Sequence, residues 1–261
     1  MTILDKIIAE KQHEVSVRKQ EVSIHQLEKS STFSRQTISL KKALQQSNTG
    51  IIAEFKRKSP SKGWIAEHAQ ASVIPFGYQQ AGATGLSILT DYPFFGGQTK
   101  DILDAREQVT IPILRKDFMI DEYQLIEAKA MGADVILLIA AALSPKQVLT
   151  LAKMAHSLSL EVLLEIHNEQ ELAHICEEVD MVGVNNRNLK DFIVDIQYSF
   201  DLVDKIPNEC LKISESGLQN PTDVMHLRKA GYQGFLMGET FMKTAHPEKA
   251  LAAFIQQLRV N

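Results

Sequence analysis

The sequence of 261 residues contains only two cysteines, Cys176 and Cys210, and they form no CxxC pair. This scarcity excludes a small fold held together by disulfides and provides no zinc-finger spacing. The opening segment, MTILDKIIAEKQHEV, carries too many charges for a secretory signal peptide. We therefore expect a cytoplasmic protein in which both thiols are reduced.

Long apolar runs and a large net charge are also missing. The longest apolar run, VILLIAAAL at residues 135–143, is about half the length that a membrane-spanning helix requires. A formal net charge of -4 provides no general attraction for nucleic acid or for an anionic membrane. We expect neither as a partner, so that an anionic ligand would have to be bound by local groups.

Several catalytic signatures are absent as well. The sequence has no HExxH, GxSxG or GxGxxG motif, and neither cysteine falls at the end of a predicted strand. The eight histidines, His167 among them, show no metal-ligand spacing, and we expect them to be surface or helix residues. These absences disfavour metal, dinucleotide and serine or cysteine nucleophile chemistry.

From residue 51 onward, short β-branched runs alternate with amphipathic segments at a spacing of roughly 25 residues. The segment SPKQVLTLAKMAH begins with the helix-start signals Ser144 and Pro145, and NPTDVMHLRKAG ends at Gly231. This alternation predicts an α/β fold, a single (β/α)8 TIM barrel over residues 51–261, in preference to an open doubly wound sheet. The predicted strands span residues 51–56, 85–90, 111–116, 133–139, 160–166, 181–185, 211–215 and 233–238.

Residues 1–50 precede the repeated units. The segment TILDKIIAEKQHEVSVRKQ has apolar residues at helical spacing with many charges between them. We predict an N-terminal helical extension that packs on the barrel and covers one of its faces. A role in closing over a ligand is the alternative.

Polar side chains gather where the predicted strands end. The C-terminal ends of barrel strands meet at one mouth, which is where barrel enzymes place their active sites. An ion-pair network that serves only the structure would explain any one of these side chains, whereas their clustering favours a site with shifted pKa values. The residues at the strand ends are Glu54, Lys56, Lys116, Glu165, Asn185, Arg187, Glu215 and Ser216.

Glycines follow the last two predicted strands. The segments SESGL and LMGET place Gly217 and Gly238 at the start of the loops after strands seven and eight. Barrels commonly bind phosphate there, through backbone N–H groups that a glycine allows to approach closely. We expect a ligand that carries a phosphate monoester.

The motifs IIAEFKRKSPSKG, ILRKDFMIDEYQ, VLLEIHN, GVNNRNL, ISESG and LMGETFM follow one another in the order found in indole-3-glycerol phosphate synthase, and the chain resembles this family over its whole length. The resemblance implies that 1-(2-carboxyphenylamino)-1-deoxyribulose 5-phosphate closes its ring and loses carbon dioxide and water, a carbon-carbon lyase reaction of tryptophan biosynthesis. It implies a small phosphorylated substrate and no cofactor or metal. Another phosphate-binding barrel, such as an isomerase or aldolase, and a non-catalytic barrel that binds a metabolite are the alternatives.

The resemblance also implies catalytic roles. Lys116 matches the general acid that protonates the ketone, and we expect Lys56 and Arg187 to lower its pKa toward neutrality. Glu165 matches the carboxylate that stabilises the cationic intermediate. Glu54 and Lys56 match the base and acid of the dehydration, although the division of steps among these groups stays open. The predicted catalytic set is Glu54, Lys56, Lys116, Glu165, Asn185 and Ser216.

The remaining matches surround the substrate. Phe95 and Phe118 would wall the aromatic ring. Glu239 departs from the serine of some family members, so we expect its backbone N–H, and not its side chain, to face the phosphate. We expect a monomer that associates at most weakly with enzymes of the same pathway. The predicted substrate-binding set is Ser59, Pro60, Phe95, Phe118, Arg187, Leu189 and Glu215, and the predicted phosphate-binding set is Gly217, Gly238 and Glu239.

Overall fold

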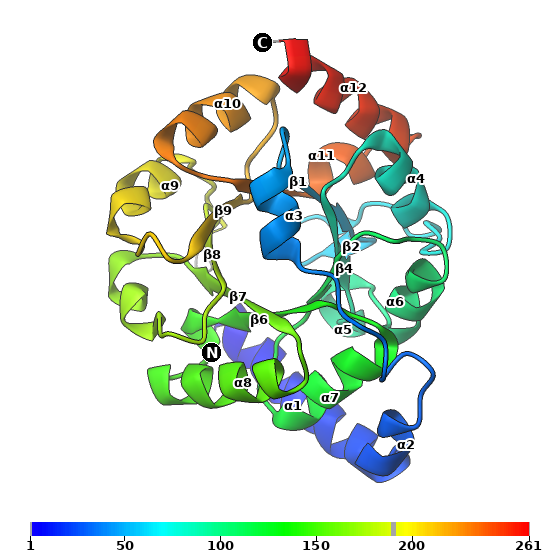
Figure 1. Cartoon of the computed structure of the whole chain (residues 1–261). Helices are drawn as coiled ribbons and strands as arrows, with labels where there is room; N and C mark the ends of the chain where they lie inside the picture. Colours follow the sequence, from blue (N-terminus) through cyan, green and yellow to red (C-terminus); the bar gives the residue numbers. More distant parts are fainter. Residues whose placement is uncertain (1, 189–191, 261) are drawn as a thin grey trace.

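The computed structural model describes residues 2–188 and 192–260, and within them eight parallel strands close into a barrel in the order β1-β10-β9-β8-β7-β6-β5-β4 (Figure 1). The predicted (β/α)8 barrel with a helical N-terminal extension is therefore confirmed. The barrel strands are β1 (Ile51–Phe55), β4 (Gly85–Leu89), β5 (Ile113–Lys116), β6 (Val135–Ile139), β7 (Glu161–Ile166), β8 (Met181–Asn185), β9 (Leu211–Glu215) and β10 (Gly234–Met237).

Two strands begin two residues later than the sequence predicts, each for a local reason. β5 starts at Ile113 because the preceding Pro112 has no N–H to give to the ladder. β6 starts at Val135 because the N–H of Ala133 still completes the turn after the preceding helix, at 3.0 Å from the carbonyl of Ala128. A short antiparallel hairpin in the first loop, β2 (Lys58–Ser59) with β3 (Gly63–Trp64), has no counterpart in the prediction.

Helices surround the barrel on the outside (Figure 1). Two of them begin or end at the predicted signals. The Ser144 side chain accepts a hydrogen bond from the N–H of Gln147 at the start of α8 (Pro145–Ser157), and Gly231, with φ +116°, ends α10 (Pro221–Ala230). After β7 the connection is a 3-10 helix, η2 (Glu169–His174). The other helices that follow barrel strands are α4 (Ile74–Ala81), α5 (Tyr92–Phe95), α6 (Thr99–Arg106), α7 (Glu122–Met131), α9 (Gln197–Leu202), α11 (Glu239–Met242) and α12 (Pro247–Val260), with the 3-10 turns η1 (Ala140–Ala142) and η3 (Val203–Lys205).

The N-terminal segment reaches both ends of the barrel. It forms α1 (Ile3–Glu21), α2 (Ile24–Glu28) and α3 (Leu40–Gln46). Leu40 and Leu44 of α3 are buried within the cluster that fills the barrel interior, and α3 lies across the opening that faces the viewer in Figure 1. Helix α1 lies behind the barrel in this view, and its first turns line a cavity at the other mouth.

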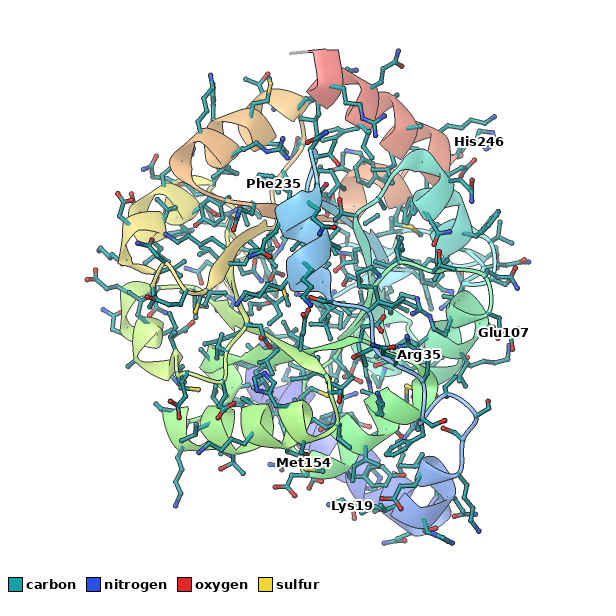
Figure 2. The ribbon with its side chains drawn as sticks, viewed as in Figure 1. Lys19, Arg35, Glu107, Met154, Phe235 and His246 are labelled. Carbon is teal, nitrogen blue, oxygen red and sulfur yellow. The ribbon has the colours of Figure 1, made fainter. Side chains whose placement is uncertain are left out.

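Apolar side chains form two layers. One cluster fills the barrel interior and includes Ile52, Leu137 and Ile213, while a larger one lies between the strands and the surrounding helices. Figure 2 shows side chains filling the interior, with Lys19 and His246 at the periphery. Burying each large apolar side chain contributes about 1.5–3 kcal/mol, so these layers hold the strand ends in place. Among the described residues, no helix combines the length and hydrophobicity needed to cross a bilayer.

Candidate active site

A cavity of about 350 Å³ opens at the C-terminal ends of the strands. Its walls combine polar strand-end residues with apolar residues of the barrel and of α1, including Leu137 and Ile7. Every predicted site residue within residues 2–188 and 192–260 lines it, and Leu189 lies outside the described residues. Those that line it are Glu54, Lys56, Ser59, Pro60, Phe95, Lys116, Phe118, Glu165, Asn185, Arg187, Glu215, Ser216, Gly217, Gly238 and Glu239.

The opposite charges at the end of β1 form a direct pair. Lys56 Nζ lies 2.6 Å from Glu54 Oε1, and both side chains border the cavity because they are two residues apart along the chain. Glu54 is buried, and the absence of a side chain at Gly238 makes room for it, since a Cβ there would lie 2.5 Å from Glu54 Oε1. The glycine of the last loop thus helps to place a carboxylate as well as leaving the backbone accessible.

Lys116 lies between two carboxylates. Its Nζ is 2.8 Å from Glu165 Oε2 and 2.6 Å from Glu215 Oε2. Burial tends to lower the pKa of Lys116, but the charges of Glu165, Glu215 and Glu54 outweigh it, and the pKa is raised. The prediction of a lowered pKa is therefore wrong.

The two cations expected to lower the pKa of Lys116 are paired elsewhere. Lys56 is paired with Glu54, and Arg187 lies 3.9 Å from a carboxylate oxygen of Glu239. Carboxylates, and not cations, are the charged groups in direct contact with Lys116. The ammonium group is consequently protonated at neutral pH and available to donate hydrogen bonds.

The two carboxyl groups on either side of Lys116 have pKa values that are shifted in opposite directions. Burial raises the pKa of Glu215 to about 7, and the charges of Glu165 and Glu54 add to this against the opposing effect of Lys116. For Glu165, burial is outweighed by Lys116 and His167, so that its pKa is lowered. Glu165 is ionised at neutral pH, whereas Glu215 can gain or lose a proton there.

Glu165 has further polar neighbours on its other oxygen. Asn185 donates from Nδ2 to Glu165 Oε1 at 3.1 Å, and His167 Nε2 lies 3.3 Å from the same atom. His167 lies directly after β7 with its side chain 9% exposed, so the expectation that it is a surface or helix residue is wrong. Its spacing could have revealed it, because His167 follows Glu165 by two residues, as Lys56 follows Glu54.

The turns that follow β9 and β10 line the part of the cavity where a phosphate is expected. Ser216 has φ +68° and Gly217 φ +76°, and the carbonyl of Ser216 accepts a hydrogen bond from Asn186 Nδ2 at 3.1 Å. Glu239 begins α11, and its carboxylate is turned toward Lys62, whose Nζ lies 2.5 Å from Oε1. Lys62, on the first loop, was not predicted as a site residue, although it lies within the SPSKG motif.

An aromatic wall borders the cavity on one side. The rings of Phe95 and Phe118 have centroids 6.1 Å apart and planes inclined at 38°. The helix α1 adds Ile3, Leu4 and Ile7 to the same cavity. An aromatic substrate ring would find apolar surface here.

The N-terminal helix is fixed to the barrel by a buried ion pair. Lys11 Nζ lies 3.1 Å from Asp91 Oδ1 and 2.9 Å from Asp117 Oδ1, and Asp117 directly follows Lys116. The Lys11 side chain is 1% exposed, so its charge depends on these carboxylates. As for metals, no group of three or more His, Cys, Asp or Glu side chains within residues 2–188 and 192–260 is arranged to hold an ion.

Comparisons with known proteins agree with these features. The family model of indole-3-glycerol phosphate synthase matches residues 4–254. The chain is 52% identical to the indole-3-glycerol phosphate synthase of Bacteroides thetaiotaomicron, over 98% of this chain and 99% of the relative. It is 42% identical to that of Burkholderia ambifaria (96% and 97%) and 40% identical to that of Acinetobacter baumannii (98% and 96%). The similarity spans both the barrel and the N-terminal helices.

Proposed function

The chain belongs to the indole-3-glycerol phosphate synthase family, and we propose that the cavity at the mouth of its barrel is the active site. The protein is a carboxy-lyase of tryptophan biosynthesis with a phosphorylated substrate. The observation that carries the proposal is the position of Lys116 between Glu165 and Glu215, with the Glu54–Lys56 pair on the same cavity. The substrate we assign to it is 1-(2-carboxyphenylamino)-1-deoxyribulose 5-phosphate.

Lys116 is the proton donor for ring closure in this proposal. The substrate's ring carbon attacks the ketone, and the ketone oxygen, which becomes strongly basic as the bond forms, takes a proton from the lysine. A raised pKa is compatible with this role, because the group remains protonated until that oxygen develops charge. The cation left on the substrate is stabilised by the ionised Glu165, and loss of carbon dioxide returns its bonding pair to the ring.

The Glu54–Lys56 pair is assigned to the dehydration. This step removes a proton from the substrate and expels a hydroxyl group, which leaves as water once it is protonated. Carboxylate and ammonium groups 2.6 Å apart on the same cavity supply a base and an acid for different atoms of the substrate. Glu215, whose pKa of about 7 suits proton transfer at neutral pH, contacts Lys116 at 2.6 Å, and the charge of Glu54 contributes to raising its pKa.

The other lining residues are assigned to binding. We place the substrate's aromatic ring against Phe95 and Phe118, which present a wall of two rings. Its phosphate is placed at the backbone of Gly217 and Gly238, with the Glu239 side chain held aside by Lys62. The remaining polar contacts to the carboxylate, hydroxyls and first loop are assigned to Ser59, Pro60, Asn185, Arg187, Glu215 and Ser216.

We also propose that the active unit is a monomer located in the cytoplasm. The groups assigned above to catalysis all lie at the mouth of one barrel, so one chain can supply them, and both cysteines are free. In this view residues 1–50 are an extension packed on the barrel domain of residues 51–261, because α1 contributes both cavity lining and the buried Lys11. Association with other enzymes of the pathway would be weak, and sedimentation of the purified chain at several concentrations would test the monomer.

The function is tested by incubating the purified protein with 1-(2-carboxyphenylamino)-1-deoxyribulose 5-phosphate, without added metal or cofactor. Formation of an indole ring changes ultraviolet absorption and fluorescence, so turnover can be followed continuously. Turnover is the expected result. Binding without turnover would indicate a metabolite-binding barrel instead and would contradict the proposed roles of Lys116 and Glu165.

A further inference from the structure

His167 lies behind the proposed catalytic carboxylate and outside the cavity lining. It directly follows β7, and its side chain is 9% exposed. Nε2 lies 3.3 Å from Glu165 Oε1, a separation at which the two groups form an ion pair, although they are not aligned as a hydrogen bond. The ring touches a proposed catalytic group without bordering the space that the substrate would occupy.

Glu171 holds the other side of the ring. His167 Nδ1 lies 3.2 Å from Glu171 Oε2, and the same oxygen accepts the backbone N–H of His167 at 2.7 Å. Burial tends to lower the pKa of His167, but its contacts with Glu165 and Glu171 outweigh it and raise the pKa to about 9. The imidazole is therefore protonated at neutral pH and adds a positive charge beside Glu165.

His167 keeps a positive charge beside Glu165 when Lys116 turns to the substrate. In the proposed reaction Lys116 donates its proton to the substrate's ketone oxygen, which draws the ammonium group away from Glu165 Oε2. A buried carboxylate that loses its only cation tends to take up a proton. On Glu165 Oε1, the charge of His167 and the amide of Asn185 remain in place.

We propose that His167 is a positioning residue that keeps the Glu165 carboxylate ionised and oriented while Lys116 engages the substrate. The proposal rests on the roles assigned above to Glu165 and Lys116. Glu171, on η2, assists His167 because it contacts the ring and helps to raise its pKa. Four successive side-chain contacts link Glu171, His167, Glu165, Lys116 and Glu215, and acidic and basic residues alternate along them.

A purely structural role is the competing explanation, because the His167–Glu171 contact also fastens η2 to the end of β7. The two explanations differ in what they predict for the folded enzyme. A fastening residue affects the free energy of unfolding and leaves the turnover of folded molecules unchanged. A positioning residue affects kcat, with little effect on KM, because Glu165 acts on the intermediate and not on the substrate's binding groups.

The test compares His167→Asn with Glu171→Gln, each assayed after the folded fraction has been determined by urea unfolding. For His167→Asn we expect kcat to fall between about 10- and 100-fold, the range that follows from slight misplacement of a catalytic group, with KM changed by less than about threefold. Glu171→Gln keeps the ring but weakens its charge, so it should lower kcat in the same direction by a smaller factor. It also provides the test if His167→Asn does not fold.

Unchanged kcat in both variants, with a loss of stability only, would overturn the proposal and leave His167 as a fastening residue. A histidine ring titration in the wild-type protein by NMR gives an independent reading, since a His167 ring that is neutral at pH 7 could not act in this way. Glu165→Gln and Lys116→Met distinguish failure of this inference from failure of the proposed function. If these two variants are inactive while His167→Asn is fully active, only the role of His167 is wrong.

Discussion

Arg115 and Lys116 are neighbours on β5, yet their side chains belong to two different charge clusters, because successive residues of a strand point to opposite faces. The anchor cluster lies where the barrel meets α1 and α7 and consists of Lys11, Asp91, Arg115, Asp117 and Glu127. The mouth cluster surrounds the cavity and consists of Glu54, Lys56, Lys116, Glu165 and Glu215.

The clusters differ in how completely their carboxylates are paired. In the anchor cluster, Asp117 Oδ1 contacts Lys11 at 2.9 Å and the N–H of Phe118 at 2.8 Å, while Oδ2 contacts Thr90 at 2.5 Å and Arg115 at 3.1 Å. Burial is outweighed by these cations, and the pKa of Asp117 is lowered. The Asp117 carboxylate is therefore ionised at neutral pH and holds α1 and β5 together through its ion pairs with Lys11 and Arg115.

In the mouth cluster one carboxylate is left incomplete. Glu215 Oε1 has neither a hydrogen-bond partner nor an ion pair among the described residues, and its other oxygen shares Lys116 with Glu165. In the anchor cluster Glu127 Oε2 also lacks a hydrogen bond within these residues, but it lies 2.8 Å from Arg115.

There is room for the Glu215 side chain because Gly183 has none of its own, since a Cβ there would collide with Glu215 Oε1. Both clusters contain cations and anions in close contact. The mouth cluster differs in having, beside a cavity, a carboxylate oxygen without a partner in the described part of the chain, as expected of an active site and not of a structural ion-pair network.

The largest expected effect is on stability and comes from Arg115→Met. Arg115 is fully buried, and its removal leaves Asp117 and Glu127 with fewer counterions in a place that water does not reach. Breaking a buried pair in this way lowers the free energy of unfolding by about 3–5 kcal/mol. Urea unfolding measures this, and Arg115→Lys, which keeps the charge, should lower it less. A loss below about 1 kcal/mol, the size of an exposed pair, would mean that the anchor cluster does not fasten the fold.

Lys116→Met should have the complementary effect. We expect kcat to fall about 100-fold or more, equivalent to ~2.7 kcal/mol, while affinity for the substrate is retained, because the lysine acts in the transition state. Stability should change by less than about 1 kcal/mol, since Glu215 can take up a proton when its cation is removed. Steady-state kinetics and urea unfolding of the same preparation test both parts. A stability loss equal to that of Arg115→Met would erase the distinction between the clusters.

Glu215 should make stability depend on pH in a direction that Asp117 does not. Its pKa is raised from 4.5 to about 7, so between these pH values the folded protein binds a proton that the unfolded chain has released. This group therefore lowers the stability as pH rises from 4.5 to 7, by up to about 1.4 kcal/mol per pH unit. Glu215→Gln should remove this slope, as measured by urea unfolding at several pH values. An identical slope in wild type and variant would contradict the raised pKa.

Asp117 provides the matched comparison on the other cluster. Because its pKa is lowered in the folded state, its contribution is present above the ordinary value of 3.8 and is lost only as the pH falls through the lowered one. Asp117→Asn should thus change the acid limb of the stability profile and not the region near neutrality. In urea unfolding, Glu215→Gln should therefore change the stability between pH 4.5 and 7, and Asp117→Asn the stability at acid pH.

The sequence predicts the mouth well because strand alternation and motif order place residues by chain position alone. Strand ends of a closed parallel barrel must converge, so Glu54, Lys116 and Glu165 could be brought together without coordinates. The pKa of Lys116 could not be predicted, because the sign of its shift depends on which charged groups lie within about 3 Å of the ammonium group. The sequence placed both cations and carboxylates at this mouth, and the fold brings two of the carboxylates, Glu165 and Glu215, into contact with Lys116.

The anchor cluster was invisible in the sequence for a different reason. Lys11 is one of several charged residues on an amphipathic helix, where a lysine ordinarily faces solvent. Its burial depends on how α1 docks against Asp91 and Asp117, which are distant in sequence. His167 is intermediate, because its two-residue spacing from Glu165 is visible, while its partner Glu171 depends on the turn into η2.

The smallest expected effect concerns the rim, where Glu239 is paired with Lys62 and approached by Arg187. A carboxylate beside a phosphate site competes with the ligand for the same cations, but an exposed pair of this kind contributes only about 0–1 kcal/mol. Glu239→Ser should therefore lower KM by about threefold at low ionic strength, and added salt should reduce the difference. Asp104→Ser, which breaks the exposed Lys100 pair on α6, is the control and should leave KM unchanged. A higher KM in Glu239→Ser would contradict this prediction. It would mean that the carboxylate positions Lys62 for the phosphate, so that the pair at the rim has a structural role, as the ion pairs of the anchor cluster do.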